Sequence, residues 1–396
     1  MPAARIRELP PYLFARIDDI KQEALAAGID VIDLGIGDPD LSPPEPVIDA
    51  LIRGVRKDGA HHYSSYAGLP RLRRAFSEWF EHRFGVPVDP DREVLPLIGS
   101  KEGIGHIYLS QVDPGDEVLI PDPGYPVYAA GAVLAGAIPR YFPLRRENSY
   151  LPAVADLEGM VSPRTRMMWL NYPSNPTAVL ADRTSFEEAA RFARDRGLLI
   201  CHDMAYSEIT FDGARSVSFL EIDGGKDVCV EFHSLSKTFC MPGWRVGFAV
   251  GNAGAIGALA KVKTNLDSGI FIPLQEAAVT ALEECGDDVL RIGAVFEKRR
   301  NLFVSGLAGA GWDVPLPPST FYVWAPIPAG YDSMGFCTHL LREAGIVCTP
   351  GTGFGKQGEG FVRMSLTVPD ERLEEAVARL RGIGIVYKEQ EVLRVL

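Results

Sequence analysis

The stretch DVCVEFHSLSKTFCMPGWRVGF, from Asp227 to Phe248, joins an apolar run to a lysine between hydroxyl residues and to an arginine eight residues after that lysine. The lysine, Lys237, stands a few residues after the apolar run DVCVEF, at the start of a turn that contains glycine and proline. In open α/β sheets, ligands bind beyond the carboxyl ends of the strands. The stretch therefore predicts a buried strand that delivers the amine of Lys237 and the guanidinium of Arg245 to a ligand site.

The same organisation recurs through the middle of the chain. From about Pro46 to Leu282, short aliphatic runs alternate with helical patterns such as SFEEAARFARDRG. This alternation predicts an α/β fold, with a mostly parallel sheet covered by helices on both faces. Polar or aromatic residues follow each run and would gather at one edge of the sheet: Ser100, Lys101, Glu102, Tyr125, Asn175, Asp203, Tyr206, Ser234 and Ser236.

The chain of 396 residues is long enough for more than one hydrophobic core. From about Asp288, helices and strands follow in an α+β pattern. We expect an N-terminal lid segment over 1–45 that joins a small domain, a large domain over 46–287 and the small C-terminal domain over 288–396.

Composition limits the functional classes. A formal net charge of −12, without a long Lys/Arg run, argues against nucleic-acid binding. The first residues show no signal-peptide pattern, and no apolar run approaches the ~20 residues of a membrane span, so we expect a cytoplasmic protein. The six cysteines occur singly and suit buried packing, and the seven histidines have no metal-ligand spacing, so we expect no metal.

Each polar feature taken alone has a structural explanation. Glycine and proline mark turns, an aspartate after a strand caps a helix, and a tyrosine near a turn packs half-buried. A single lysine is usually solvated. The order and chemistry of these features together favour one functional site.

Three segments resemble motifs of the fold-type I pyridoxal-phosphate enzymes, specifically the class I and II aminotransferases. These segments are SLSKTFCMPGWRVGF, NYPSNPT and CHDMAYSEITF, and the resemblance runs from LGIGDPD at Leu34 to Arg363. It implies a seven-stranded, mostly parallel sheet between helices with a smaller α+β domain, the cofactor pyridoxal 5′-phosphate, and a homodimer with shared active sites.

The resemblance also implies cofactor-binding roles. Lys237 would form a Schiff base with the cofactor and then act as a general base, while Asp203 would face the pyridine nitrogen. Asn175 and Tyr206 would bind the phenolic oxygen, and Tyr125 would stack on the ring. The phosphate would be held by Arg245, Ser234, Ser236, the helix start Ser100, Lys101 and Glu102, and Tyr63 of the neighbouring subunit.

For the substrate, the resemblance assigns the α-carboxylate to Arg363, and Gly37 would allow close approach of the backbone. One departure is Ala178, which stands where the Asn-Pro motif usually has glycine. No Lys or Arg occurs between Lys263 and Arg291, so a simple dicarboxylate is disfavoured as the dedicated substrate.

Further segments, among them LPPYLFARIDD, PDPGYPVY and TPGTGFG, resemble the LL-diaminopimelate aminotransferases. That family moves an amino group between LL-2,6-diaminopimelate and 2-oxoglutarate by a ping-pong mechanism, on the route to lysine and cell-wall peptide. Tyr12 and Lys101 match positions that line its substrate pocket, and Asn175 is a further candidate for substrate binding. Asp267 is a candidate partner for the distal ammonium, with a helix cap as the alternative.

Alternatives remain at this stage. A broad alanine, aromatic or aspartate aminotransferase, or a pyridoxal-phosphate enzyme of secondary metabolism, shares much of this sequence. A non-catalytic cofactor-sensing regulator would carry an added basic DNA-binding domain. The stretch GTGFGKQG from Gly351 resembles a dinucleotide loop, but a strand follows it, so it predicts a loop near the substrate.

Overall fold

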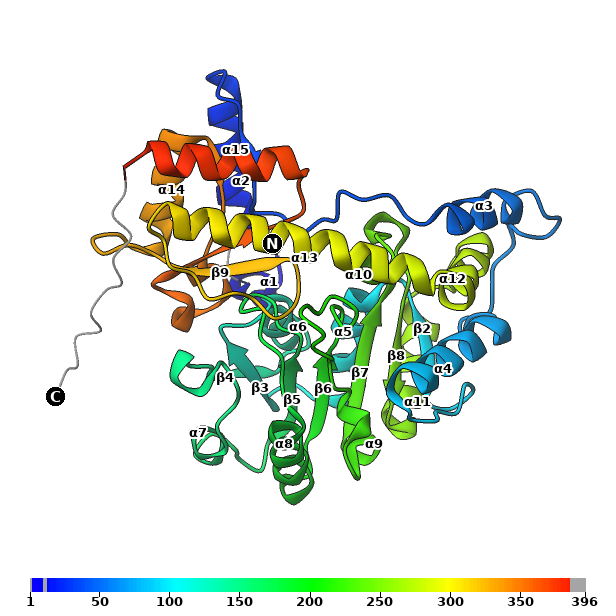
Figure 1. Ribbon diagram of the computed structural model, residues 1–396. Coiled ribbons are helices and arrows are strands. Elements are labelled where there is room, and N and C mark those ends of the chain that lie inside the picture. Colours follow the sequence, from blue (N-terminus) through cyan, green and yellow to red (C-terminus); the bar gives the residue numbers. More distant parts are fainter. Residues whose placement is uncertain (1, 10–12, 385–396) are drawn as a thin grey trace.

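The computed structural model describes residues 2–9 and 13–384, and a seven-stranded sheet forms its centre (Figure 1). The strand order is β2-β8-β7-β6-β5-β3-β4, and every neighbouring pair is parallel except the two pairs that involve β8. The predicted mostly parallel sheet is confirmed. Its strands are β2 (Val94–Leu97), β3 (Glu117–Asp122), β4 (Ile138–Pro143), β5 (Thr165–Asn171), β6 (Leu199–Asp203), β7 (Cys229–Ser234) and β8 (Gly247–Gly251).

Side chains of the central strands are buried on both faces of this sheet. In β5, Met167 and Trp169 join the core beneath one set of helices, while Met168 and Leu170 join the core on the opposite face. This explains why the strands are continuous apolar runs. The first face is covered by α5 (Ser100–Gln111), α6 (Val127–Leu134) and α11 (Ala253–Leu266), and the second by α4 (Pro70–Phe84) and α8 (Arg183–Arg196). Helix α12 (Ile272–Glu284) packs on α4, and α3 (Glu45–Gly54) packs on α12.

A second, antiparallel sheet has its own core. Its order is β11-β12-β9, formed by Thr349–Pro350, Phe361–Ser365 and Tyr322–Pro326. Strand β1 (Ile32–Asp33) pairs with β10 (Ile346–Val347), so the N-terminal segment joins this part of the molecule. The domain boundaries at residues 45 and 287 stay a prediction.

Helix α13 (Gly286–Gly309) runs from the region of α12 to the small sheet (Figure 1). It is followed in the chain by α14 (Ser333–Ala344) and α15 (Asp370–Gly382). The other helices are short or N-terminal: α1 (Ala4–Glu8), α2 (Leu13–Ala26), α7 (Val154–Glu158), α9 (Gly225–Val228) and α10 (Leu235–Thr238).

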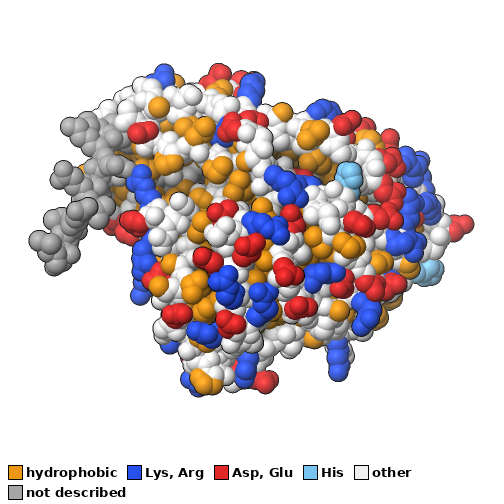
Figure 2. Space-filling view, turned by 60° about the horizontal axis from the view of Figure 1, so that its bottom comes forward, with side chains coloured by type: hydrophobic (Ala, Val, Ile, Leu, Met, Phe, Trp, Pro, Cys, Tyr) orange, Lys and Arg blue, Asp and Glu red, His pale blue; other side chains and the backbone are white. Residues whose placement is uncertain are grey.

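The distribution of surface charge and the state of the cysteines agree with the expectations from composition. Basic and acidic side chains are interspersed on the face drawn in Figure 2, which shows no broad basic area. All six cysteines are free and buried, as the sequence predicts. Within residues 2–9 and 13–384, no helix combines the length and the apolar character needed to cross a bilayer.

A buried arginine ties three segments together. Arg299 of α13 is 4% exposed, and its guanidinium donates to both carboxylate oxygens of Asp40 at 2.6 and 2.9 Å. Its Nε donates to Asp370, the first residue of α15, at 2.9 Å. The segment that follows β1 is therefore fixed to α13 and α15 by one side chain.

Arg299→Ala is expected to lower the free energy of unfolding by about 3 kcal/mol, because two partly buried carboxylates lose their common partner. Urea denaturation would measure the change. The matched control is Lys298→Ala, since the Lys298 side chain is 69% exposed and donates to the same Asp370 at 2.7 Å. Lys298→Ala should lower the free energy of unfolding by about 0.5 kcal/mol. Equal losses of stability in the two variants would contradict the expectation that the buried arginine contributes more than the exposed lysine.

Candidate active site

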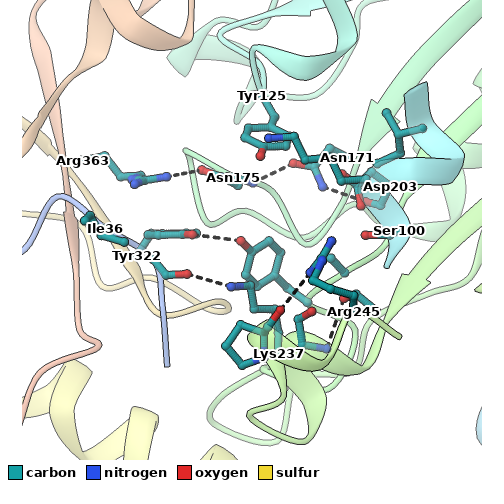
Figure 3. A pocket seen from close by; sticks show the side chains of 18 of the residues that line it. Ile36, Ser100, Tyr125, Asn171, Asn175, Asp203, Lys237, Arg245, Tyr322 and Arg363 are labelled. Carbon is teal, nitrogen blue, oxygen red and sulfur yellow. Dashed lines mark hydrogen bonds between the residues drawn. The ribbon is translucent and has the colours of Figure 1, made fainter. Parts of the chain in front are cut away.

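A cavity of about 400 Å³ lies where β5, β6 and β7 end. Its wall combines residues of the large sheet with Arg363 and Tyr322 of the small sheet and with Gly37 of the N-terminal segment (Figure 3). The structure brings together most of the predicted site residues here: Gly37, Ser100, Lys101, Tyr125, Asn175, Asp203, Tyr206, Ser234, Ser236, Lys237, Arg245 and Arg363.

The amine of Lys237 occupies the lower part of this view (Figure 3). Lys237 lies in α10, whose N-cap is Ser234, and its Nζ donates to the carbonyl of Gly37 at 2.7 Å. The pKa of Lys237 is lowered to about 8, mainly by burial; Asp38 opposes this effect, and the nearby Arg363 and Arg245 add to it. The site therefore makes the neutral, nucleophilic amine accessible near neutral pH.

Arg245, Ser236 and the start of α5 form an anion-binding arrangement. A Cβ on Gly99 would lie 2.2 Å from Arg245 Nη2, so the guanidinium packs where only glycine leaves room. The Oγ of Ser236 is buried without a hydrogen-bond partner among the described residues. Helix α5 begins at Ser100 without a side-chain cap, so a ligand oxygen can accept from its first N–H groups.

A hydrogen-bonded row crosses the upper part of the site (Figure 3). Arg363 donates to the side chain of Asn175 at 2.8 Å, and the backbone N–H of Asn175 donates to Asn171 Oδ1 at 2.8 Å. Asn171 then donates to the backbone carbonyl of Asp203 at 2.7 Å. The row fixes groups from β12, β5 and β6 relative to one another.

The Asp203 carboxylate is buried and asymmetrically bonded. Its Oδ2 accepts from the hydroxyl of Tyr128 at 2.8 Å, whereas its Oδ1 is buried without a partner among the described residues. Burial raises the pKa of Asp203, and the hydrogen bond from Tyr128 opposes that effect. A cationic ring nitrogen in the cavity would satisfy this carboxylate.

Arg363 provides a buried guanidinium for a carboxylate. It is 3% exposed, it donates to the carbonyl of Gly35 at 2.7 Å, and its Nε has no partner among the described residues. The guanidinium carbon lies 4.1 Å from the centroid of the Tyr322 ring. A planar cation held in this way suits bidentate binding of a carboxylate.

Gly37 is required by packing against a tyrosine. A Cβ at this position would lie 1.9 Å from the hydroxyl oxygen of Tyr322. That hydroxyl is 2.9 Å from the hydroxyl of Tyr206. Burial raises the pKa of Tyr206 well above its ordinary value, so the phenol keeps its proton and can donate.

Two predicted residues lie outside the cavity wall. Glu102 accepts from the backbone N–H of Ile98 at 2.9 Å, and its Oε1 is 2.6 Å from His106 Nδ1. Asp267 accepts from the buried Lys263 at 2.8 Å. Lys263 lies 3.4 Å from Glu102 Oε2 as well, so one buried ammonium lies between the two carboxylates. Neither side chain lines the cavity, and the roles expected for Glu102 at the cofactor and for Asp267 at the substrate stay predictions.

Tyr63, Tyr12 and Ala178 were also singled out in the sequence. Tyr63 is 92% exposed and does not line the cavity of its own chain. Tyr12 lies outside the described residues. Ala178, the departure from the Asn-Pro motif, has φ 60°, a left-handed conformation that favours glycine, so alanine is tolerated here at a local conformational cost.

The structure adds residues that sequence reasoning missed. Asn171, Tyr128 and Tyr322 take part in the hydrogen bonds above, and Asp18 of α2 also lines the cavity. Asn171 and Tyr128 belong to the segments NYPSNPT and PDPGYPVY, which the sequence analysis singled out without assigning a role to either residue. Tyr322 and Asp18 come from distant segments and carry no local signal.

Comparison with protein families and curated sequences identifies close relatives. Residues 29–380 match the family model described as aminotransferase class I and II. The LL-diaminopimelate aminotransferase of Desulforudis audaxviator is 52% identical over 380 residues, covering 96% of this chain and 97% of that protein. The enzyme of the same name from Dehalococcoides mccartyi (strain 195) is 50% identical, covering 95% and 97%.

Solved structures share the architecture. A substrate-bound structure of BacF from Bacillus subtilis aligns with a TM-score of 0.94 at 34% identity, covering 99% of this chain and 100% of that one. An aspartate aminotransferase from Thermotoga maritima aligns with a TM-score of 0.90 at 29% identity, covering 96% and 99%. The large sheet and the small sheet therefore belong to a shared fold.

Proposed function

This chain belongs to the class I and II aminotransferases, and we propose that it transfers an amino group between LL-2,6-diaminopimelate and 2-oxoglutarate. The proposal is supported by the curated relatives of that name at 45–52% identity over nearly the whole chain. Tetrahydrodipicolinate would be the other product, in the formation of lysine and peptidoglycan precursors. The reaction would proceed in two half-reactions at one cavity.

We propose pyridoxal 5′-phosphate as the cofactor, because class I and II aminotransferases depend on it in general. The residues present fit this group. Two buried oxygen atoms without partners among the described residues, Asp203 Oδ1 and Ser236 Oγ, match its ring nitrogen and its phosphate. When bound, the cofactor supplies an electron sink for negative charge at the substrate α-carbon.

In this proposal the anion-binding arrangement holds the phosphate. Arg245 would pair with the dianion, and Ser234, Ser236, Ser100 and the first N–H groups of α5 would donate to its oxygens. Tyr125 would pack on the ring face. Asn175 and Tyr206 would donate to the phenolic oxygen, since the buried Tyr206 retains its proton.

Lys237 would hold the cofactor and then move the proton at the α-carbon. An amine with a pKa of about 8 is a usable base near neutral pH, because an ordinary lysine would stay almost fully protonated. The carbonyl of Gly37 accepts from this amine in the structure and would orient it.

Attachment of pyridoxal to the cofactor-free protein should speed up as the pH rises and reach half its plateau rate near pH 8. The direction follows from the lowered pKa of Lys237, since only the neutral amine attacks an aldehyde. Borohydride trapping followed by mass spectrometry of the peptide containing Lys237 would measure the rates. A midpoint above pH 10 would contradict the lowered pKa.

The cavity also carries charges that fit the distal end of diaminopimelate. We assign Arg363 to the α-carboxylate and Arg245 to the phosphate. Lys101 and Asp18 then remain as one cation and one anion on the cavity wall. The distal head of the substrate is itself a carboxylate and an ammonium, so these two residues are its proposed partners.

A donor panel tests the substrate. The cofactor-loaded protein would be given LL-diaminopimelate, alanine, aspartate and phenylalanine with 2-oxoglutarate, and glutamate would be followed. A kcat/KM for diaminopimelate at least about tenfold above the others is expected, as two extra polar contacts provide ~1–3 kcal/mol each. Asp18→Asn should lower kcat/KM for diaminopimelate and leave kcat/KM for the other donors unchanged. A preference for another donor would reject the substrate while leaving the aminotransferase assignment intact.

We also propose a homodimer in which Tyr63 reaches the phosphate in the neighbouring subunit. Tyr63, Tyr66 and Phe271 are 92%, 46% and 40% exposed. The Tyr63 segment is held next to Phe271, since Ser64 donates to the carbonyl of Ile270 at 2.9 Å. Such exposed aromatic side chains suit an interface between subunits. Sedimentation equilibrium tests the proposal, and a monomeric mass would reject the homodimer.

A further inference from the structure

The two oxygens of the Asp203 carboxylate have different surroundings. The hydroxyl of Tyr128 donates to Oδ2 at 2.8 Å, and both side chains are buried. Oδ1 is equally buried but has no partner among the described residues. An unpaired buried carboxylate oxygen is unfavourable, so the arrangement is complete only when a donor reaches Oδ1 from the cavity.

Tyr128 itself is rigidly held. Its ring stacks on Trp169 with centroids 4.7 Å apart and an interplanar angle of 11°, and Phe232 stacks on Trp169 at 5.7 Å. The Tyr108 hydroxyl donates to the backbone carbonyl of Tyr128. All four aromatic residues are fully buried. The Tyr128 hydroxyl therefore has one position, and it is aimed at Asp203.

We propose that Tyr128 is a positioning residue, which fixes Oδ2 of Asp203 so that Oδ1 is presented to the ring nitrogen of the cofactor. This rests on the proposed function. A carboxylate free to rotate would offer either oxygen, or swing away from the ring. The bond from Tyr128 removes that freedom before the cofactor arrives.

The phenol acts as a donor throughout. Burial raises the pKa of Tyr128 well above its ordinary value, and the charge on Asp203 raises it further, so Tyr128 keeps its proton. The hydroxyl can therefore support the ionised form of Asp203, against the effect of burial on that carboxyl group.

The test uses a cofactor that lacks the ring nitrogen. Dissociation constants of the cofactor-free protein would be measured for pyridoxal 5′-phosphate and for its 1-deaza analogue, in which C–H replaces the nitrogen. Tyr128→Phe removes only the hydroxyl and keeps the aromatic stack. This variant should raise the dissociation constant for pyridoxal 5′-phosphate about tenfold, which corresponds to the loss of a hydrogen bond to a charged group. The dissociation constant for the deaza analogue should change less than twofold.

Tyr172→Phe is the matched control. Tyr172 is buried, and its hydroxyl donates to the backbone carbonyl of Tyr150 at 2.7 Å rather than to Asp203. It should change the affinities for the two cofactors by equal factors. Thermal unfolding of the cofactor-free proteins would report any general loss of packing.

Equal weakening of both cofactors in Tyr128→Phe would overturn the positioning role. If wild-type protein binds the two cofactors equally, the assignment of Asp203 to the ring nitrogen fails, and this inference fails with it. Absence of any binding to wild-type protein would instead reject the proposed cofactor. A crystal structure of the loaded wild-type protein gives a readout without a variant, because an Asp203 carboxylate turned away from Tyr128 would also overturn the proposal.

Discussion

Lys237→Ala is expected to reduce transamination by about 10⁴-fold or more, because one side chain supplies both the attachment point and the proton-transferring base. No other lysine amine in the cavity wall donates to the carbonyl of Gly37. The effect should appear in single-turnover rates with every amino donor. The visible absorption of the loaded protein should change as well, since the covalent attachment is lost.

Lys261→Ala is the control for this variant. Lys261 lies on the exposed side of α11 and does not line the cavity. Its loss should leave the rate unchanged. Turnover by Lys237→Ala within tenfold of wild type would remove Lys237 from the mechanism.

Arg363→Gln is expected to lower kcat/KM by about 10²- to 10³-fold for amino donors and oxo acids alike, because both carry the same α-carboxylate. The guanidinium is buried between Tyr322 and Phe354, at 4.1 and 4.9 Å from their ring centroids, so water cannot replace it easily. Arg363→Lys should recover only part of the activity, since an ammonium lacks the planar fork.

Two comparisons separate carboxylate binding from general damage. The loss should be small for an amine donor that has no α-carboxylate. Arg372→Gln, which removes an arginine paired with Asp30 and Glu375 away from the cavity, should change kcat/KM less than twofold. An equal loss with both kinds of donor would show that Arg363 supports the fold rather than the substrate.

The sequence predicted the large sheet well because its signals are local. The runs that became β5, β6 and β7 are largely apolar and almost wholly buried, and each ends in a polar residue at the cavity. Asn171, Asp203 and Ser234 are the last residues of these strands. The alternation of apolar runs with helical patterns and the rule that ligands bind at carboxyl ends were sufficient here.

Contacts between distant segments could not be predicted in the same way. Gly37 lines the cavity as expected, but its packing against Tyr322, 285 residues later in the sequence, could not be read from its own segment. Glu102 of α5 and Asp267 at the end of α11 are bonded to His106 and to Lys263, respectively, and neither carboxylate lines the cavity. Side-chain direction at a helix start depends on tertiary partners that spacing does not reveal.

The cavity is assembled from two sources that differ in what they contribute. The large sheet and its helices carry Lys237, Asp203, Ser236 and Arg245, whereas Arg363 and Tyr322 come from the small sheet and Asp18 from α2. Within the second set, Asp18 is the residue that we assign to the distal head of the substrate rather than to the α-carboxylate that all donors share, so a substitution there would change the preferred amino acid and leave the cofactor-binding residues in place. Such modularity makes this scaffold evolvable, because a duplicated gene can acquire another metabolic role while its cofactor chemistry is inherited intact.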